Sequence, residues 1–180
     1  MKILKSWILV CAFVFVGLAA RSAEASAKLI PELEPLRPFL GKTWKGHFKN
    51  STPEKPVVDI SKWERALNGQ AIRVLHSINN GVYGGETIFM VNGKTKEIEY
   101  HYFTTAGFMT KGTMVVEGKK MISKETVVGN QEGVTEVHAT SEITADGKLK
   151  VVSRYLKEGE WVDGHSVTYE QAPDASVIFK

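Results

Sequence analysis

Turn signals recur at short, regular intervals over most of this chain. Pairs such as Asn68-Gly69, Asn92-Gly93 and Asp146-Gly147 belong to a series that falls roughly every 12 residues from Trp44 onward, which is the spacing typical of β-hairpins. Such intervals leave no room for helical crossovers, so successive strands must run antiparallel and lie mostly beside their neighbours in sequence. The sequence therefore predicts an all-β protein.

Between the turns, the residues alternate as they do in strands with one dry and one wet face. In the segment 97–105, Ile98, Tyr100 and Tyr102 share one phase, whereas the other phase begins with glutamates. We expect strands at residues 43–50, 57–67, 71–79, 85–92, 96–105, 108–117, 120–128, 134–144, 148–156 and 160–171. A meander of about ten strands leaves two edges unless it closes, so we expect an antiparallel up-and-down barrel with a lumen wide enough for a ligand.

The segment before the first strand, KLIPELEPLRPFLG, combines apolar and helix-breaking residues. Leu29, Leu33, Leu36 and Leu40 recur at helical spacing, but three prolines interrupt the segment. Because interior prolines break a regular helix, we expect one or two short turns. These turns would form a plug across one mouth of the barrel.

Residues 1–27 have the organisation of a secretory signal peptide. Lysines at positions 2 and 5 precede an apolar run over residues 7–20, and small residues ending at Ala27 follow, as in a cleavage site. The run is short for a membrane span of about 20 residues. We expect cleavage after Ala27, no stable membrane insertion afterwards, and a periplasmic or secreted protein of one domain, residues 28–180. An uncleaved anchor is the alternative.

Processing changes both the thiol content and the charge. The single cysteine, Cys11, leaves with the leader, which excludes disulfides, zinc–cysteine clusters and a cysteine nucleophile in the mature chain. The leader carries Lys2, Lys5 and Arg21 against Glu24, so the formal charge falls from +3 to about +1. Since the charged residues are interspersed, the sequence lacks the basic face of a nucleic-acid or anionic-membrane binder.

The stretch LRPFLGKTWKG, residues 36–46, contains Gly41-Lys42-Thr43. A phosphate-binding loop would need glycine where Leu36 stands and a helix afterwards, so nucleotide binding is not expected. The motif PFLGKTWKG resembles the first-strand signature of the calycin barrels, which include lipocalins, fatty-acid-binding proteins and haem-carrying nitrobindins. It is most similar to the nitrobindin form, although Lys42 adds a residue before Trp44. Together with WERALNG, residues 63–69, it also resembles a group of small, uncharacterised, exported bacterial proteins.

This resemblance implies a calycin-like barrel with an indole closing its floor and a small molecule in its lumen. Nitrobindins carry haem on a histidine late in the sequence, and His165 is the nearest positional match. In fatty-acid-binding relatives, an arginine and a tyrosine hold a carboxylate. Arg65, Arg73 and Arg154 are the strand arginines here, and surface ion pairing is the simpler expectation for all three.

The expected inward phase defines a set of ligand-binding candidates. His76 shares its phase with Val74 and Ile78, and His165 shares its phase with Val167. The aromatic candidates would line an apolar pocket with hydroxyls at its rim, or they would pack together as part of the hydrophobic core. The sequence leaves both interpretations open. The full candidate set is Trp44, Trp63, His76, Tyr100, Tyr102, His165 and Tyr169.

The preferred functional hypothesis is an exported, non-catalytic carrier or sensor that binds a small apolar molecule. It needs no cofactor, and haem binding is its special case. The alternative is a barrel enzyme, an isomerase or hydrolase, with an inward histidine paired to a carboxylate; the sequence shows His76 but no clearly inward carboxylate. A third hypothesis is a packed barrel that acts through its surface on a protein partner that the sequence does not identify.

Overall fold

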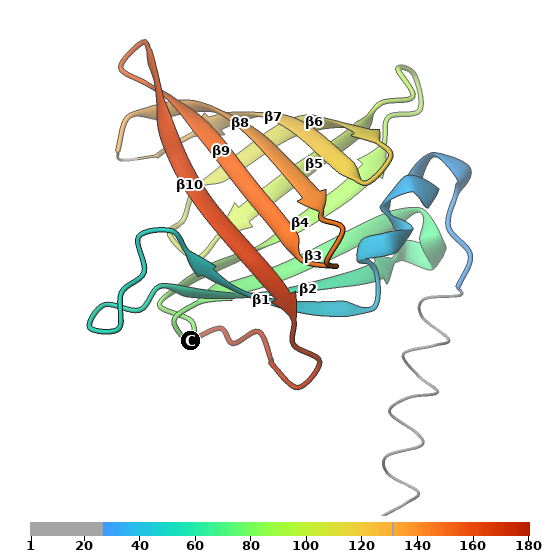
Figure 1. Ribbon diagram of the computed structural model, residues 1–180. Coiled ribbons are helices and arrows are strands. Elements are labelled where there is room, and N and C mark those ends of the chain that lie inside the picture. Colours follow the sequence, from blue (N-terminus) through green and yellow to red (C-terminus); the bar gives the residue numbers. More distant parts are fainter. Residues whose placement is uncertain (1–26, 131) are drawn as a thin grey trace, which may run out of the picture.

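The chain forms ten antiparallel strands that close into a single barrel (Figure 1). The structure is a computed structural model that describes residues 27–130 and 132–180; the expected signal peptide lies outside these residues except for Ala27. The strands are β1 (Lys42–Phe48), β2 (Val58–Ala66), β3 (Ala71–Ile78), β4 (Tyr83–Val91), β5 (Ile98–Thr104), β6 (Met109–Glu117), β7 (Lys120–Val128), β8 (Val134–Ile143), β9 (Leu149–Lys157) and β10 (Glu160–Gln171). Each lies within two residues of its expected bounds at both ends.

The barrel closes because the first and last strands pair with each other. Trp44 on β1 lies opposite Ser61 on β2 and also opposite Gln171 on β10. The order around the barrel otherwise follows the sequence. The all-β, up-and-down barrel expected from the turn spacing is therefore confirmed, and closure removes the two exposed edges of the meander.

A 3-10 helix, η1 (Pro31–Phe39), lies at one end of the barrel (Figure 1). Leu33, Leu36 and Phe39 are completely buried and belong to the same core cluster as Trp44. They recur every third residue because a 3-10 helix has three residues per turn. The expected short N-terminal helix is thus present, but its apolar stripe follows a spacing of three, and the buried Leu29 and Leu40 flank it.

The chain after β10 returns along the outer wall of the barrel. The backbone N–H of Ile178 donates to Oγ of Ser77 over 3.0 Å, and Ser77 is buried as a result. Within the described residues, no helix combines the length and the apolar character that crossing a membrane requires.

Candidate functional site

A cavity of about 740 Å³ lies inside the barrel. Its lining includes Ala106 and Asn130, from the loops that follow β5 and β7, as well as Tyr83 at the start of β4. These positions are at the end of the barrel opposite η1, since η1 leads into the start of β1. The cavity therefore opens at the end away from the plug.

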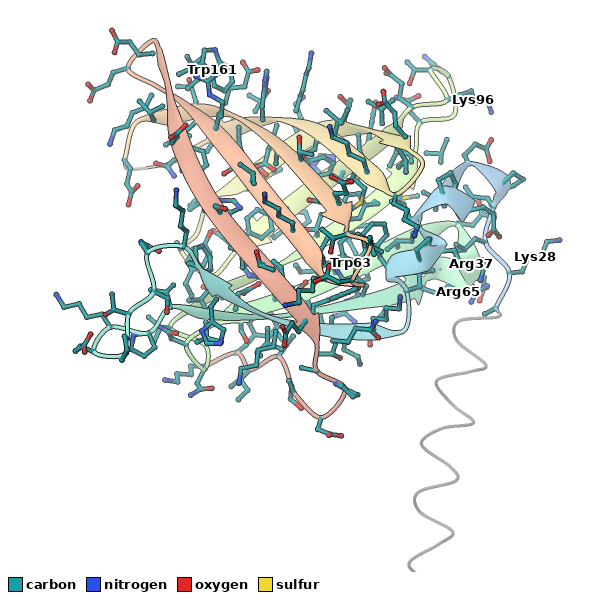
Figure 2. The ribbon with its side chains drawn as sticks, in the orientation of Figure 1. Lys28, Arg37, Trp63, Arg65, Lys96 and Trp161 are labelled. Carbon is teal, nitrogen blue, oxygen red and sulfur yellow. The ribbon has the colours of Figure 1, made fainter. Side chains whose placement is uncertain are left out.

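The wall next to the plug is aromatic and apolar. Ring centroids are separated by 5.1 Å between Phe39 and Trp63, by 5.7 Å between Trp63 and Phe89, and by 5.2 Å between Phe89 and Tyr100. Figure 2 shows Trp63 inside the barrel near the plug, whereas Trp161 lies at the far end. With Met114 also lining the cavity, this region offers a molecule mainly apolar contact.

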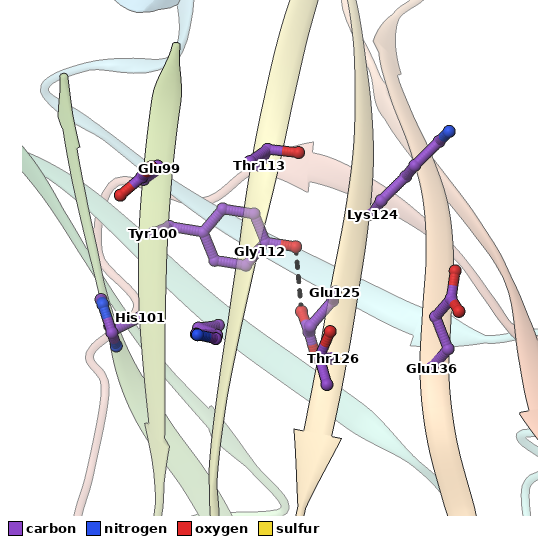
Figure 3. Close-up of a pocket in the computed structure, with 10 residues that line it drawn as sticks. Glu99, Tyr100, His101, Gly112, Thr113, Lys124, Glu125, Thr126 and Glu136 are labelled. Carbon is purple, nitrogen blue, oxygen red and sulfur yellow. Dashed lines mark hydrogen bonds between the residues drawn. The ribbon is translucent and has the colours of Figure 1, made fainter. Parts of the chain in front are cut away.

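Tyr100 reaches a carboxylate by lying across a glycine. Tyr100 on β5 and Glu125 on β7 both lie opposite Gly112 on the strand between them. The Tyr100 hydroxyl donates to Oε2 of Glu125 over 3.1 Å, as the dashed line in Figure 3 shows. A Cβ at Gly112 would overlap the Tyr100 ring and the Lys124 carbonyl. The absence of a side chain at Gly112 is what allows the contact.

A second tyrosine also reaches a carboxylate by lying across a glycine on the strand between them. Tyr169 on β10 and Asp59 on β2 both lie opposite Gly46 on β1. The Tyr169 hydroxyl donates to Oδ2 of Asp59 over 2.9 Å, and a Cβ at Gly46 would overlap the Tyr169 ring. Burial, together with the neighbouring Asp59 carboxylate, holds the pKa of Tyr169 well above its usual value, so this hydroxyl keeps its proton and acts as a donor.

Asp59 also anchors a histidine. His76 Nδ1 lies 2.8 Å from Oδ1 of Asp59, and His76 Nε2 lies 2.7 Å from the hydroxyl of Tyr102. The imidazole is thus held between a carboxylate and a hydroxyl, one at each ring nitrogen. The Tyr102 hydroxyl is also 3.0 Å from that of Tyr83, and desolvation raises the pKa of both tyrosines. The result is a continuous polar chain within the cavity wall.

His165 faces the cavity from β10 beside a β-bulge. Its Nδ1 lies 2.6 Å from the Tyr155 hydroxyl and 3.0 Å from Oγ of Ser153, while its Nε2 has no hydrogen-bond partner among the residues that the structure describes. Burial lowers the pKa of His165, with a smaller opposing effect from Asp59. The ring is thus held in a fixed orientation and favours its neutral form.

Glu125 is the inward carboxylate with the least protein hydrogen bonding. Desolvation raises its pKa, and its two polar neighbours, Thr110 and Tyr100, oppose this rise. The Thr110 hydroxyl lies close enough to influence Glu125 but meets no partner with hydrogen-bond geometry, although Thr110 is only 2 % exposed. Oε1 of Glu125 and the Thr110 hydroxyl therefore interact with each other but form no hydrogen bond of normal geometry within the described residues.

The structure brings most of the candidate residues together. Those that line the cavity are Trp63, His76, Tyr100, Tyr102, His165 and Tyr169. Trp44 does not line it, because its side chain is completely buried in the core cluster around η1.

The strand arginines lie away from the cavity. Arg73 is paired with Glu86, with an Nε–Oε1 distance of 2.9 Å, and Arg154 lies over the Trp161 ring at 5.9 Å. Arg65 donates to the Lys28 carbonyl beside the plug, where Figure 2 shows both residues. The arrangement by which an arginine and a tyrosine hold a carboxylate is therefore absent from the described cavity lining.

Sequence reasoning missed two inward carboxylates, the buried Asp59 and the half-buried Glu125. The expectation of no clearly inward carboxylate is wrong, since Asp59 and Glu125 both face the cavity. The strand alternation in the sequence does indicate their inward orientation, because Asp59 shares its phase with Trp63 and Glu125 shares its phase with Met121. Within residues 27–130 and 132–180, no group of three or more histidine, cysteine or acidic side chains is placed to hold a metal ion.

Comparison with known proteins supports the fold alone. No protein-family model matches the chain, and no curated protein matches it. Among solved structures, the crystal structure of Rv2717c from M. tuberculosis is similar, with a TM-score of 0.60 and 16 % sequence identity over 81 % of this chain and 99 % of that one. At this identity, the likeness extends to the barrel architecture and not to a shared activity.

Proposed function

We propose that this protein is an exported carrier or sensor that binds one small, mainly apolar molecule in its cavity without transforming it. The observation that carries the proposal is a cavity of about 740 Å³ with an aromatic wall at the plugged end and polar side chains nearer the mouth. This volume is within the range of small-molecule sites, about 300–1,000 Å³. The leader-like residues 1–27 support export.

Binding strength would come mainly from apolar contact. Burial of apolar surface contributes roughly 25 cal/mol per Å², and the loss of translational and rotational freedom on association offsets part of that gain. Trp63 and Phe89 supply the apolar wall, while the polar groups of Tyr102 and Glu125 orient the bound molecule.

A neutral apolar fluorophore, N-phenyl-1-naphthylamine, tests the cavity directly. We expect its emission to rise on titration and to saturate at one molecule per chain. Ala139→Phe places a ring in the cavity and should abolish this rise, because Ala139 lines it. Thr140→Phe, at the next position on β8 and on its opposite face, is the matched control and should bind as the unmodified protein does.

Two results would contradict the proposal that the cavity binds a small molecule. If the fluorophore does not bind, or if both variants bind it equally while circular dichroism shows an intact fold, the packed-barrel hypothesis replaces this one. Native mass spectrometry of protein purified without denaturant complements the titration, since a retained small molecule would identify the natural ligand class.

Haem is the special case of the proposal, and His165 is the residue that would hold it. Its Nδ1 is held by Tyr155 and Ser153, its Nε2 is available, and burial favours the neutral ring that metal ligation needs. Haem bound there would supply an iron centre tuned by the surrounding pocket. Reconstitution with hemin should then give a Soret band that His165→Ala removes and that His47→Ala, at an exposed position, leaves unchanged. No such band with the folded protein would exclude this case.

A second candidate function is acid–base catalysis, and one specific observation favours it. His76 is within hydrogen-bond distance of both Asp59 and Tyr102 inside the cavity, which is the paired arrangement that the enzyme hypothesis requires. It predicts that the co-purified molecule is slowly converted to a product visible by NMR. Asp59→Asn should slow that conversion about 10²–10⁴-fold, and an unchanged molecule after long incubation would exclude catalysis.

A further inference from the structure

The charge balance of the cavity lining points to a particular class of ligand. The ionisable side chains there, apart from tyrosines and histidines, are Asp59, Glu125 and Glu132, and the described lining contains no lysine or arginine. The whole sequence has a formal charge of +3, or about +1 without residues 1–27, so the acidic lining contrasts with the overall composition.

Of the two carboxylates inside the barrel, Glu125 has more capacity left for a ligand than Asp59. Both oxygens of Asp59 are already engaged, Oδ1 by His76 and Oδ2 by Tyr169. Glu132 is exposed at the mouth. Glu125 uses Oε2 for Tyr100, and its Oε1 has no hydrogen bond within the described part of the chain. The buried hydroxyl of Thr110 lies beside it, close enough to lower the pKa of Glu125 but without a hydrogen bond of normal geometry.

We infer that the cavity binds a cationic amphiphile, an apolar molecule with an amine or similar positive group, and that Glu125 receives the positive group. This inference rests on the proposed function and names its ligand class. An ammonium group donates hydrogen bonds to the open Oε1 of Glu125 and to the Thr110 oxygen, so both unused groups are satisfied together. The apolar body then occupies the remaining space beside Trp63 and Phe89.

The charges of the cavity lining favour a cationic ligand over a fatty acid. A carboxylate drawn into the cavity would face Glu125 and Asp59 without a nearby lysine or arginine, and burying an unpaired charge is costly. A cation instead forms a charge-assisted hydrogen bond, which is about twice as strong as a neutral one. The Tyr100 ring, whose hydroxyl contacts Glu125, adds cation–π attraction.

Three decyl compounds that share a tail test the inference: decylamine, decanol and decanoate, each kept below its aggregation concentration. Displacement of N-phenyl-1-naphthylamine reports their affinities. We expect decylamine to bind at least tenfold more tightly than decanol, and decanoate to bind most weakly. Glu125→Gln should weaken decylamine about tenfold and leave decanol unchanged, because glutamine keeps the size of the side chain and still accepts from Tyr100.

Glu142→Gln is the matched control, since Glu142 is an exposed glutamate on β8; it should leave all three affinities unchanged. If decanol or decanoate binds as tightly as decylamine, or if Glu125→Gln has no effect, the inference is overturned although the carrier function survives. If none of the three compounds displaces the fluorophore, the inference is likewise overturned. Failure of the fluorophore itself to bind would instead remove the carrier function on which the inference depends.

Discussion

At the scale of single residues, Gly46 and Gly112 each lie on the middle one of three neighbouring strands. On one flanking strand, a tyrosine lies opposite the glycine, and it contacts an acidic residue that lies opposite the same glycine on the other flanking strand. Two strand spacings amount to roughly 9.5 Å, and only a ring lying flat across the middle strand spans that gap. The identity of the middle residue therefore decides whether each acid has a hydrogen-bond donor. Single-residue patterns do not reveal this, because it depends on register across three strands.

Gly112→Ala tests this dependence. The new methyl group would overlap the Tyr100 ring and the Lys124 carbonyl, and overpacking of this kind costs about 1–3 kcal/mol. We expect that loss in the free energy of unfolding, measured with urea, together with weaker decylamine binding. Gly93→Ala is the control, because a Cβ at Gly93 meets no atom within 4 Å; equal stability of the two variants would contradict the prediction.

The raised pKa of Glu125 predicts a definite pH dependence of stability. Desolvation lifts this pKa above its ordinary 4.5, so between 4.5 and the raised value the folded state binds more protons than the unfolded state, and stability falls as pH rises. The titratable side chains facing Glu125 are tyrosines whose pKa values are themselves raised, so they stay neutral in this range. They are Tyr83, Tyr100, Tyr102 and Tyr155.

Glu125→Gln removes this proton linkage. The variant should gain stability relative to the unmodified protein as pH rises above 4.5, and the difference should level off below that pH. Urea unfolding from about pH 4 to about pH 8 measures this difference. A difference that does not change with pH would show that the carboxyl group titrates normally.

At the scale of elements, the strands were largely predictable and the side chains inside the barrel only partly so. The ten strands follow from local turn chemistry, which a single sequence displays directly. Asp59 and Glu125 were missed because acids in strands usually face solvent; only cross-strand partners such as Tyr169 and Tyr100 make their burial acceptable. Trp44 was expected in the cavity lining, but η1 covers its ring.

The helix η1 should contribute strongly to stability as an element. Leu36 is completely buried against the core cluster, and leucine-to-alanine changes at such sites cost about 2–5 kcal/mol. We expect Leu36→Ala to lower the urea midpoint accordingly. Leu67→Ala is the control at a side chain that is 63 % exposed, where a change within about 0.5 kcal/mol is expected. Equal effects would mean that the plug packs loosely.

At the scale of the whole molecule, closure distinguishes this barrel from an open sheet. The pairing of β1 with β10, for example Gly46 with Tyr169, turns two strands that would be edges into interior ones. Native-state hydrogen exchange followed by NMR should therefore show amides of β1 as protected as those of β6. Fast exchange along both β1 and β10 would indicate an open sheet. The bulge between Asp163 and Ser166 should exchange faster than the rest of β10.

With η1 seated across one end, the barrel has the form of a cup and not of a pipe. Under the proposed carrier function, a bound molecule could not pass straight through and would leave by the rim that it crossed on entering. A partner that supplies this molecule and a partner that receives it would then compete for the same rim, so the protein could not contact both at the same time. The protein would therefore have to bind the two partners in turn.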